Sequence, residues 1–287
     1  RALSTETKRF EKRSVPWDLP MKGILSVTLR RKVRRKFGGR MKAMVSGGAP
    51  LNPDVGLFFQ AMGLPMLQGY GQTEAGPVIS CNRPKAGIRT ETVGPPMKNT
   101  EVRIAEDGEI MVRGELVMKG YWHNPDESGR VLQSSADGAG DWLATGDVGH
   151  LDEKGRIVIT DRKKDLIVND KGDNVSPQRV EGMLTLQPEI LQAMVYGDRR
   201  PHLVALLVPD TEELRSVKDD PEALQRALSK AVDRVNADVS VIEKVRRFVL
   251  ADEPFSVENE MLTPSMKIRR HVIGKNYGER LDSLYKK

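Results

Sequence analysis

The chain is poor in cysteine, in aromatic residues and in long apolar runs. Cys81 is its only cysteine, which excludes an intramolecular disulfide and a cysteine-based metal cage and fits a reducing cytoplasm. Aromatic residues make up 5% of the sequence, so a core must rest mainly on aliphatic side chains. The longest apolar runs, such as residues 203–208, have the length of a strand and are too short to span a membrane. We expect a globular, cytoplasmic protein, and 287 residues are enough for two domains.

Three further signals are missing from the sequence. It begins at Arg1 without an initiator methionine or an apolar signal core, so we expect a chain cut from something longer. Its histidines are scattered without the spacing of metal ligands: His123, His150, His202 and His271. It also contains no Gly-x-Ser-x-Gly nucleophile elbow, which leaves hydrolase chemistry without support.

The positive charge is concentrated at the N-terminal end. Residues 1–45 hold fourteen Lys and Arg against three Asp and Glu, a net charge of +11, whereas the whole chain carries +6. Such a segment favours peripheral contact with an anionic membrane surface. It is equally typical of a solvated helix face, or of a face that once met a missing part of the protein. Nucleic acid is not expected, because no aromatic stacking residues interleave with the charges.

The first third of the sequence has an α/β pattern. It predicts, in order, a polar helix over residues 1–40, a strand over 41–46, a glycine loop over 47–50, a helix over 52–62 and a strand over 64–68. Asn52 at the cap and Pro53 in the first turn favour the start of the second helix.

The pattern of apolar residues changes after residue 91. Short alternating runs separated by turn residues predict strands over 101–104, 109–113 and 156–160, typical of a small antiparallel sheet or barrel. After the charged residues 161–165, we predict helices over 177–186 and 221–236, strands over 193–196, 202–209 and 245–250, and a basic tail.

The fold prediction is therefore an α/β protein of two domains. Residues 1–161 would form the end of a large domain, with an α/β segment to about residue 91 and a β-rich subdomain over about 92–161. Residues 162–287 would form a small α+β domain.

The strongest chemical signal lies in residues 68–74, with the sequence QGYGQTE. A strand delivers this loop, and its glycines let the backbone approach a ligand closely. Tyr70 offers a flat face to a base, Thr73 a hydroxyl to a phosphate oxygen, and Glu74 a carboxylate to Mg²⁺. Taken alone, the same residues could be a tight turn followed by a helix cap.

Four other motifs surround this loop in the sequence. They are residues 46–51 (SGGAPL), 142–147 (WLATGD), 159–165 (ITDRKKD) and 262–270 (LTPSMKIRR). Together, in this order, the motifs resemble the adenylate-forming superfamily of acyl-CoA synthetases, luciferases and peptide-synthetase adenylation domains. The long-chain acyl-CoA synthetase branch is the most similar, given residues 45–51 (VSGGAPL) and 174–177 (NVSP). The resemblance extends from about residue 40 to 275.

The resemblance implies a nucleotide site. Contacts with the nucleotide are implied for Gly47, Gly48, Ala49, Gln68, Gly69, Tyr70, Gly71, Thr73, Asp147, Ile159 and Arg162. The first three would line the adenine pocket, and Tyr70 would stack on the ring. Thr73 would bind the α-phosphate and Glu74 the magnesium, and both are implied to be catalytic.

The ribose would be held by Asp147 and Arg162. A carboxylate suits two hydroxyls because both of its oxygens accept hydrogen bonds. Without the resemblance, residues 145–147 are typical of a hairpin turn, and Arg162 of an exposed charge in a linker.

The resemblance also implies a mobile C-terminal lid domain. Lys164 matches the hinge about which that domain rotates, and Gly172 matches a loop that faces the active site in the thioester-forming pose, on the coenzyme A side. Lys267 matches the catalytic lysine that bridges the substrate carboxylate and the α-phosphate. Met266 stands where glycine is frequent, and the neighbouring Arg269 and Arg270 leave open which cation acts. A plain basic tail is the alternative.

The implied function is ATP-dependent activation of a carboxylic acid, a long-chain fatty acid, through acyl-AMP to acyl-CoA, with ATP, Mg²⁺ and coenzyme A as cofactors and substrates. Members of this family run to roughly twice this length, and we find no Ser/Thr/Gly-rich loop for the β- and γ-phosphates. We therefore expect an inactive fragment whose partner is the missing N-terminal half.

The alternatives are an acyl-AMP or acyl-carrier-protein ligase, a non-catalytic nucleotide-binding module, and a membrane or nucleic-acid adaptor.

Overall fold

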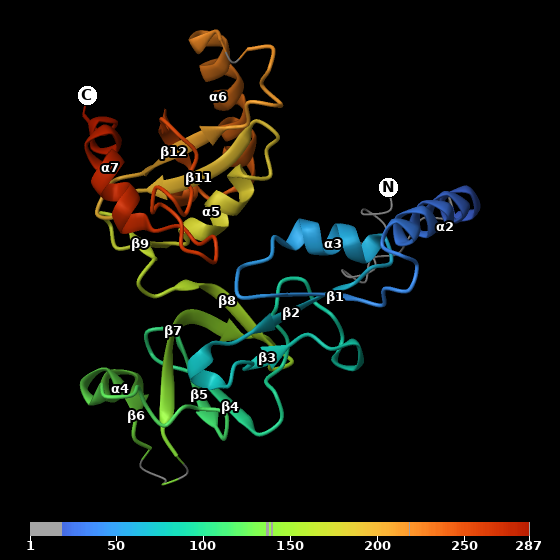
Figure 1. Ribbon diagram of the computed structural model, residues 1–287, viewed down its shortest axis with the longest axis vertical. Coiled ribbons are helices and arrows are strands. Elements are labelled where there is room, and N and C mark those ends of the chain that lie inside the picture. Colours follow the sequence, from blue (N-terminus) through green and yellow to red (C-terminus); the bar gives the residue numbers. More distant parts are fainter. Residues whose placement is uncertain (1–18, 136–137, 139, 218, 287) are drawn as a thin grey trace. The chain divides into compact units, whose positions relative to one another are not determined.

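The computed structural model of the protein describes residues 19–135, 138, 140–217 and 219–286. It divides into two compact units, the first ending at Lys163 and the second beginning at Lys164 (Figure 1). The sequence prediction had placed the division two residues earlier. The part of the predicted N-terminal helix before Leu19 lies outside the described residues. In the described ranges, no helix combines the length and the apolar character needed to cross a bilayer.

The first unit opens with a helix and a small mixed sheet. Helix α2 (Leu19–Lys36) precedes strand β1 (Met44–Gly47), helix α3 (Pro53–Ala61) and strand β2 (Met66–Tyr70). The two strands pair in parallel, and β3 (Ser80–Cys81) pairs antiparallel with β2. Asn52 caps α3 as predicted, because its side chain accepts the Asp54 backbone N–H at 2.8 Å.

Strands β1 and β2 both lie a few residues later in the sequence than their apolar runs predicted. The prediction ended β2 at Gln68, yet Gly69 and Tyr70 continue its ladder, Gly69 pairing with Gly47 on one side and with Cys81 on the other. Backbone pairing needs no apolar side chain, so the hydrophobic pattern alone misses residues of this kind.

The β-rich half of the first unit is antiparallel. Its strands are β4 (Thr100–Ile104), β5 (Glu109–Gly114), β6 (Leu132–Gln133), β7 (Trp142–Leu151) and β8 (Ile157–Arg162). The order in the sheet is β4-β5-β7-β6, and β8 also pairs with β7. Helix α4 (Pro125–Val131) and the short 3₁₀ turns η1 (Thr73–Ala75) and η2 (Pro84–Ala86) complete it. The three predicted strands are confirmed as β4, β5 and β8, whereas β7 was missed because polar residues and Gly146 interrupt its alternation.

The second unit is a three-stranded sheet with helices on both faces. Strands β11 (Ile190–Tyr196) and β12 (Leu203–Pro209) are antiparallel, and β13 (Val245–Leu250) pairs in parallel with β12. Alternate residues of β12 point to opposite faces: Leu203, Ala205 and Leu207 join one buried cluster, and Val204, Leu206 and Val208 the other. This explains why residues 203–208 are apolar without interruption.

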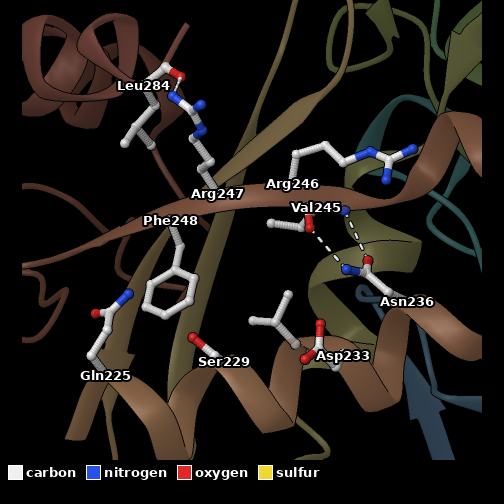
Figure 2. Close-up of a pocket in the computed structure, with 10 residues that line it drawn as sticks. Gln225, Ser229, Asp233, Asn236, Val245, Arg246, Arg247, Phe248 and Leu284 are labelled. Atoms are coloured by element: carbon white, nitrogen blue, oxygen red, sulfur yellow. Dashed lines mark hydrogen bonds between the residues drawn. The ribbon is translucent and has the colours of Figure 1, made fainter. Parts of the chain in front are cut away.

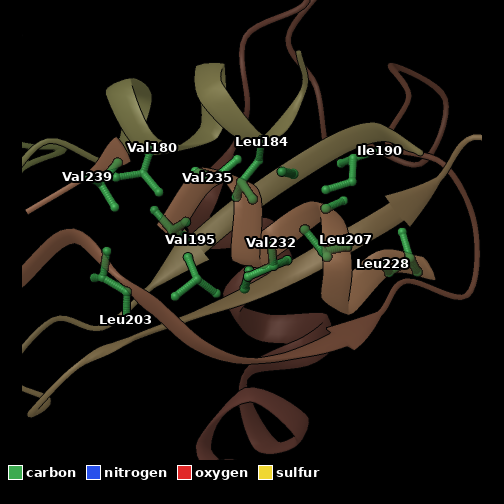
Figure 3. Close-up of a cluster of buried hydrophobic side chains, with 14 of the residues drawn as sticks. Val180, Leu184, Ile190, Val195, Leu203, Leu207, Leu228, Val232, Val235 and Val239 are labelled. Atoms are coloured by element: carbon green, nitrogen blue, oxygen red, sulfur yellow. The ribbon is translucent and has the colours of Figure 1, made fainter. Parts of the chain in front are cut away.

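Helices α5 (Pro177–Leu184) and α6 (Pro221–Asp238) cover the first face (Figure 3). Val180 and Leu184 of α5 and Leu228, Val232 and Val235 of α6 supply the helical side of this core. The remaining short elements of the unit are the hairpin β9 (Ile167–Val168) and β10 (Asn174–Val175), and the 3₁₀ turn η3 (Val241–Glu243).

Helix α7 (Arg270–Ser283) covers the second face, and the prediction of a basic tail there was wrong. The helix buries one residue per turn, Ile273, Tyr277 and Leu281, in an otherwise polar sequence. An apolar stripe this narrow is a weak signal of a helix in the sequence. It is still enough to cover β12, because β12 itself supplies most of the apolar surface.

Candidate functional site: a buried carboxylate on a β-bulge

Asp147 lies on a bulge in the middle of β7. Between the cross-strand pairs Glu109↔Val148 and Met111↔Ala144, β5 has one residue and β7 has three. Gly146 carries the irregularity at φ 71°, a backbone conformation that glycine adopts without strain. The interpretation of residues 145–147 as a hairpin turn is therefore wrong, because they lie inside a ten-residue strand.

The bulge brings Asp147 between two donors. The Tyr70 hydroxyl donates to Oδ2 at 2.7 Å, and Arg162 Nε donates to Oδ1 at 2.8 Å. The carboxylate side chain is 9% exposed, and Arg162 lies directly across the ladder from it. Each oxygen retains a further lone pair, so the carboxylate can still accept ligand hydroxyls. Tyr70, Asp147 and Arg162 thus meet in the structure, although 77 residues separate the first two.

Tyr70 has a role that the sequence did not suggest. Its ring belongs to a buried cluster, and burial raises the pKa of its hydroxyl, with the neighbouring Asp147 carboxylate raising it further. The hydroxyl therefore stays protonated and donates to Asp147 throughout the ordinary pH range. The stacking of its ring on a base stays a prediction.

The glycines of the two loops have two structural causes, close backbone packing at Gly47 and Gly71 and a positive φ at Gly48. A Cβ on Gly71 would lie 1.9 Å from the Pro77 carbonyl oxygen, and one on Gly47 would lie 3.2 Å from the Gly69 oxygen. Gly48 follows β1 at φ 79°, where glycine is favoured. The loops after β1 and β2 therefore begin side by side at the same end of the two parallel strands, with Ala49 exposed in the first.

Thr73 and Glu74 begin the turn η1, directly after this loop. Tyr121 donates its hydroxyl to Glu74 Oε1 at 2.9 Å, and burial and this carboxylate raise the pKa of Tyr121. Tyr121 is a site residue that sequence reasoning missed, because it lies far from Glu74 in the chain. Among the described residues, no group of three or more His, Cys, Asp or Glu could hold a metal ion. A single carboxylate still fits Mg²⁺, which commonly takes one or two protein oxygens beside phosphate and water.

Two implied nucleotide contacts have internal partners. Gln68 is buried, and its side-chain amide donates to the Thr90 carbonyl at 2.5 Å, so this amide holds the 90–92 segment. Ile159 of β8 packs against the buried cluster that contains Tyr70. Gln68 and Ile159 therefore make contacts inside the first unit. Their contact with a nucleotide stays a prediction.

The residues of the second unit that the sequence singled out lie in exposed loops. Lys164 is exposed in the turn that follows β8, and Gly172, at φ 87°, donates its N–H to the Asn169 carbonyl at 3.1 Å in the turn between β9 and β10. Lys267 lies in a loop whose base is the Leu262↔Ile268 bridge.

Lys267 in this loop and the two arginines that follow it, Arg269 and Arg270, differ in their surroundings. Arg270 makes a double ion pair with Glu181, at 2.6 and 2.7 Å, and Arg269 lies 3.9 Å from Glu260. Lys267 is exposed, and among the described residues its ammonium has no ion-pair partner. Of the three, Lys267 is therefore the cation best able to meet a ligand.

Met266 has a backbone conformation that favours glycine. Its φ is 61°, a left-handed conformation that costs a residue with a side chain about 1–2 kcal/mol. We expect Met266→Gly to stabilise the chain against urea by about 0.5–1 kcal/mol, since the greater freedom of glycine in the unfolded chain offsets part of the gain. Ser265→Gly is the matched control, because Ser265 has no positive φ and should give no gain. Equal effects of the two substitutions would contradict this account.

Two family models match the chain. Residues 17–122 match the model described as AMP-binding enzyme, and residues 164–287 match the AMP-binding enzyme C-terminal domain. The chain belongs to the AMP-binding enzyme family. The second match begins at the residue where the second compact unit begins.

Curated members of the AMP-binding family are similar to nearly the whole chain. A long-chain-fatty-acid–CoA ligase, FadD15 of Mycobacterium tuberculosis, is 37% identical over 275 residues, covering 90% of this chain and 44% of its own length. A chloroplastic long-chain-fatty-acid–[acyl-carrier-protein] ligase of Arabidopsis thaliana, AEE15, is 35% identical and is matched over 86% of this chain and 36% of its own length. The chain therefore spans less than half the length of these relatives.

Solved structures of the AMP-binding family share the fold. The adenylation domain of a carboxylate reductase from Mycobacterium chelonae superimposes with a TM-score of 0.75 at 26% identity, over 99% of this chain and 45% of that one. The corresponding domain from Segniliparus rugosus, in complex with AMP and a co-purified carboxylic acid, gives 0.73 at 26% identity, over 99% and 44%.

The second unit also has a groove that is lined by none of the residues of the sequence motifs. It runs between α6 and β13, where the Asn236 amide bonds both the N–H and the C=O of Val245, at 2.9 and 2.8 Å (Figure 2). Asn236 thus acts as a pairing partner for the first residue of an edge strand. None of the residues that the sequence implied for the nucleotide lines this groove.

Proposed function

We propose that this chain supplies one wall of the AMP site in an enzyme that activates a long-chain fatty acid with ATP, through acyl-AMP, to acyl-CoA. The observation that carries the proposal is the placement of Asp147 on its bulge. A buried carboxylate held by Tyr70 and Arg162, with a lone pair left on each oxygen, suits the two adjacent hydroxyls of a ribose. The acceptor carries a fixed charge and a fixed direction, as recognition of a diol requires.

Each remaining residue has a chemical task in the proposal. Thr73 donates to an α-phosphate oxygen, and Glu74, held by Tyr121, is the ligand for Mg²⁺, which would neutralise phosphate charge when bound. Lys267 stabilises the charge that builds when a carboxylate oxygen attacks the α-phosphorus and pyrophosphate leaves. A thiolate then attacks the acyl carbon, and AMP leaves. Lys164 is the hinge and Gly172 faces the thiol in the second step.

The thiol acceptor is proposed to be coenzyme A. The names of relatives support either a CoA ligase or an acyl-carrier-protein ligase. A radiolabelled fatty acid offered with coenzyme A and with a carrier protein in parallel would discriminate the two, and transfer to the carrier protein alone would overturn this part of the proposal.

We also propose that a polypeptide of this sequence alone binds AMP without completing the reaction, because we find in it no loop for the β- and γ-phosphates. Calorimetry with AMP and Mg²⁺ should detect binding, and pyrophosphate release with ATP and palmitate should stay at the level of a blank. Failure to bind AMP, with the chain folded, would overturn the proposed site. Robust pyrophosphate release would overturn the proposed inactivity and leave the site intact.

A further inference from the structure

Lys163 connects the end of the first unit to the bulge of β7. Its ammonium contacts Asp107 Oδ2 at 2.6 Å and Glu109 Oε2 at 2.8 Å, and its backbone N–H donates to the Gly146 carbonyl at 2.9 Å. Two acidic partners raise the pKa of this lysine, the hydrogen bond to Asp107 contributing most. Lys163 is the last residue of the unit, immediately before the exposed Lys164.

Glu109 transmits this contact to the bulge. Its second oxygen, Oε1, accepts the Gly146 N–H at 2.8 Å, and its side chain is 10% exposed. Both backbone groups of Gly146 are therefore bonded, the N–H to Glu109 and the carbonyl to Lys163. A glycine at positive φ is free to adopt other conformations, so these two bonds help to hold its peptide groups in one orientation.

The residue that follows Gly146 is Asp147, whose direction depends on the same peptide. The Asp147 N–H donates to Thr145 Oγ1 at 3.2 Å, and that hydroxyl donates to the Ile110 carbonyl at 2.7 Å. These contacts pin both sides of the bulge to β5. If the Gly146 peptide turned, the Asp147 carboxylate would move away from Tyr70 and Arg162.

We propose that Lys163 and Glu109 are positioning residues for ribose recognition: together they hold the Gly146 bulge so that Asp147 faces the ribose hydroxyls. The inference rests on the proposed function, since it assigns a partner to Asp147. It adds that Lys163, the residue before the proposed hinge Lys164, helps to orient the ribose acceptor Asp147. The last residue of the first unit, Lys163, is thus bonded directly to the bulge that carries Asp147.

The test compares AMP with 2′,3′-dideoxy-AMP, which lacks both ribose hydroxyls. The wild-type chain should prefer AMP by about 100-fold or more, the effect of two hydrogen bonds to a charged acceptor. Lys163→Met should reduce this preference to within about threefold and weaken AMP while leaving 2′,3′-dideoxy-AMP unchanged. Lys163→Arg should restore most of it. Lys154→Met, at an exposed lysine in the turn between β7 and β8, is the matched control and should leave the preference at the wild-type value.

Hydrogen exchange gives a second measurement that needs no ligand. The amides of Gly146 and residue 163 should exchange at least about 10-fold faster in Lys163→Met than in wild type, and remain protected in Lys154→Met. An unchanged AMP preference together with unchanged exchange at Gly146 would overturn the inference. Loss of affinity for AMP and 2′,3′-dideoxy-AMP alike would also overturn it, because it would mean a general disturbance of the fold. A wild-type chain that binds neither nucleotide would instead count against the proposed function, while the exchange measurement would still decide the role of Lys163.

Discussion

Replacing Glu181 by alanine should destabilise the second unit by about 3–5 kcal/mol, because it removes the buried carboxylate that bonds both the partly buried Arg270 and the backbone N–H of Val195. The Glu181 side chain is 8% exposed, and its two oxygens accept from Arg270 at 2.6 and 2.7 Å. Oε1 also accepts the Val195 N–H at 2.8 Å. One carboxylate thus joins helix α5, strand β11 and the first turn of helix α7.

The measurement is urea unfolding of the whole chain, followed by hydrogen exchange over residues 164–286 to assign the transition to the second unit. Glu222→Ala is the matched control. Glu222 pairs with Arg226 on the surface of α6, with side chains 86% and 63% exposed, and its loss should cost at most about 1 kcal/mol. Glu181→Leu combined with Arg270→Met should recover most of the loss, because no charge is then left buried. A cost below about 1 kcal/mol for Glu181→Ala would show that water replaces the pair.

Asp147→Ala should lower the affinity for AMP by about 100-fold or more, because each hydrogen bond to a charged acceptor contributes about 1.5–3 kcal/mol and a ribose offers two. The substitution should also destabilise the first unit by about 1–3 kcal/mol. The Tyr70 hydroxyl is buried and would lose the acceptor it bonds at 2.7 Å, whereas Arg162, 38% exposed, can turn to water.

Calorimetry with AMP measures the affinity. Unfolding of each sample followed by far-ultraviolet circular dichroism measures the loss of stability. Asp147→Asn keeps the shape of the side chain and one acceptor oxygen, so it should lie between wild type and Asp147→Ala. Tyr70→Phe is the control for support alone: it removes one hydroxyl, keeps the carboxylate and should weaken AMP only a few-fold. AMP binding within threefold of wild type in a folded Asp147→Ala sample would exclude Asp147 as the ribose acceptor.

Much of the architecture could be predicted where side-chain patterns are strong. The uninterrupted apolar run of β12, the cap of α3 and the apolar stripe of α6 all indicated their elements. The pattern failed where backbone geometry decides the structure. Gly69 and Tyr70 extend a strand, Gly146 bends one, and α7 forms around only three buried side chains.

The same distinction holds for the site. The sequence by itself determined the family, the order of its motifs and the identity of the chemical groups, because these depend on residue types at fixed spacing. Only the tertiary structure decided which groups meet. It placed Tyr70 and Arg162 on either side of Asp147, attached Tyr121 to Glu74, and engaged Arg270 with Glu181, leaving Lys267 exposed. Such partners come from strands and loops distant in the chain, and their encounter depends on register and on one bulge, which residue types do not encode locally.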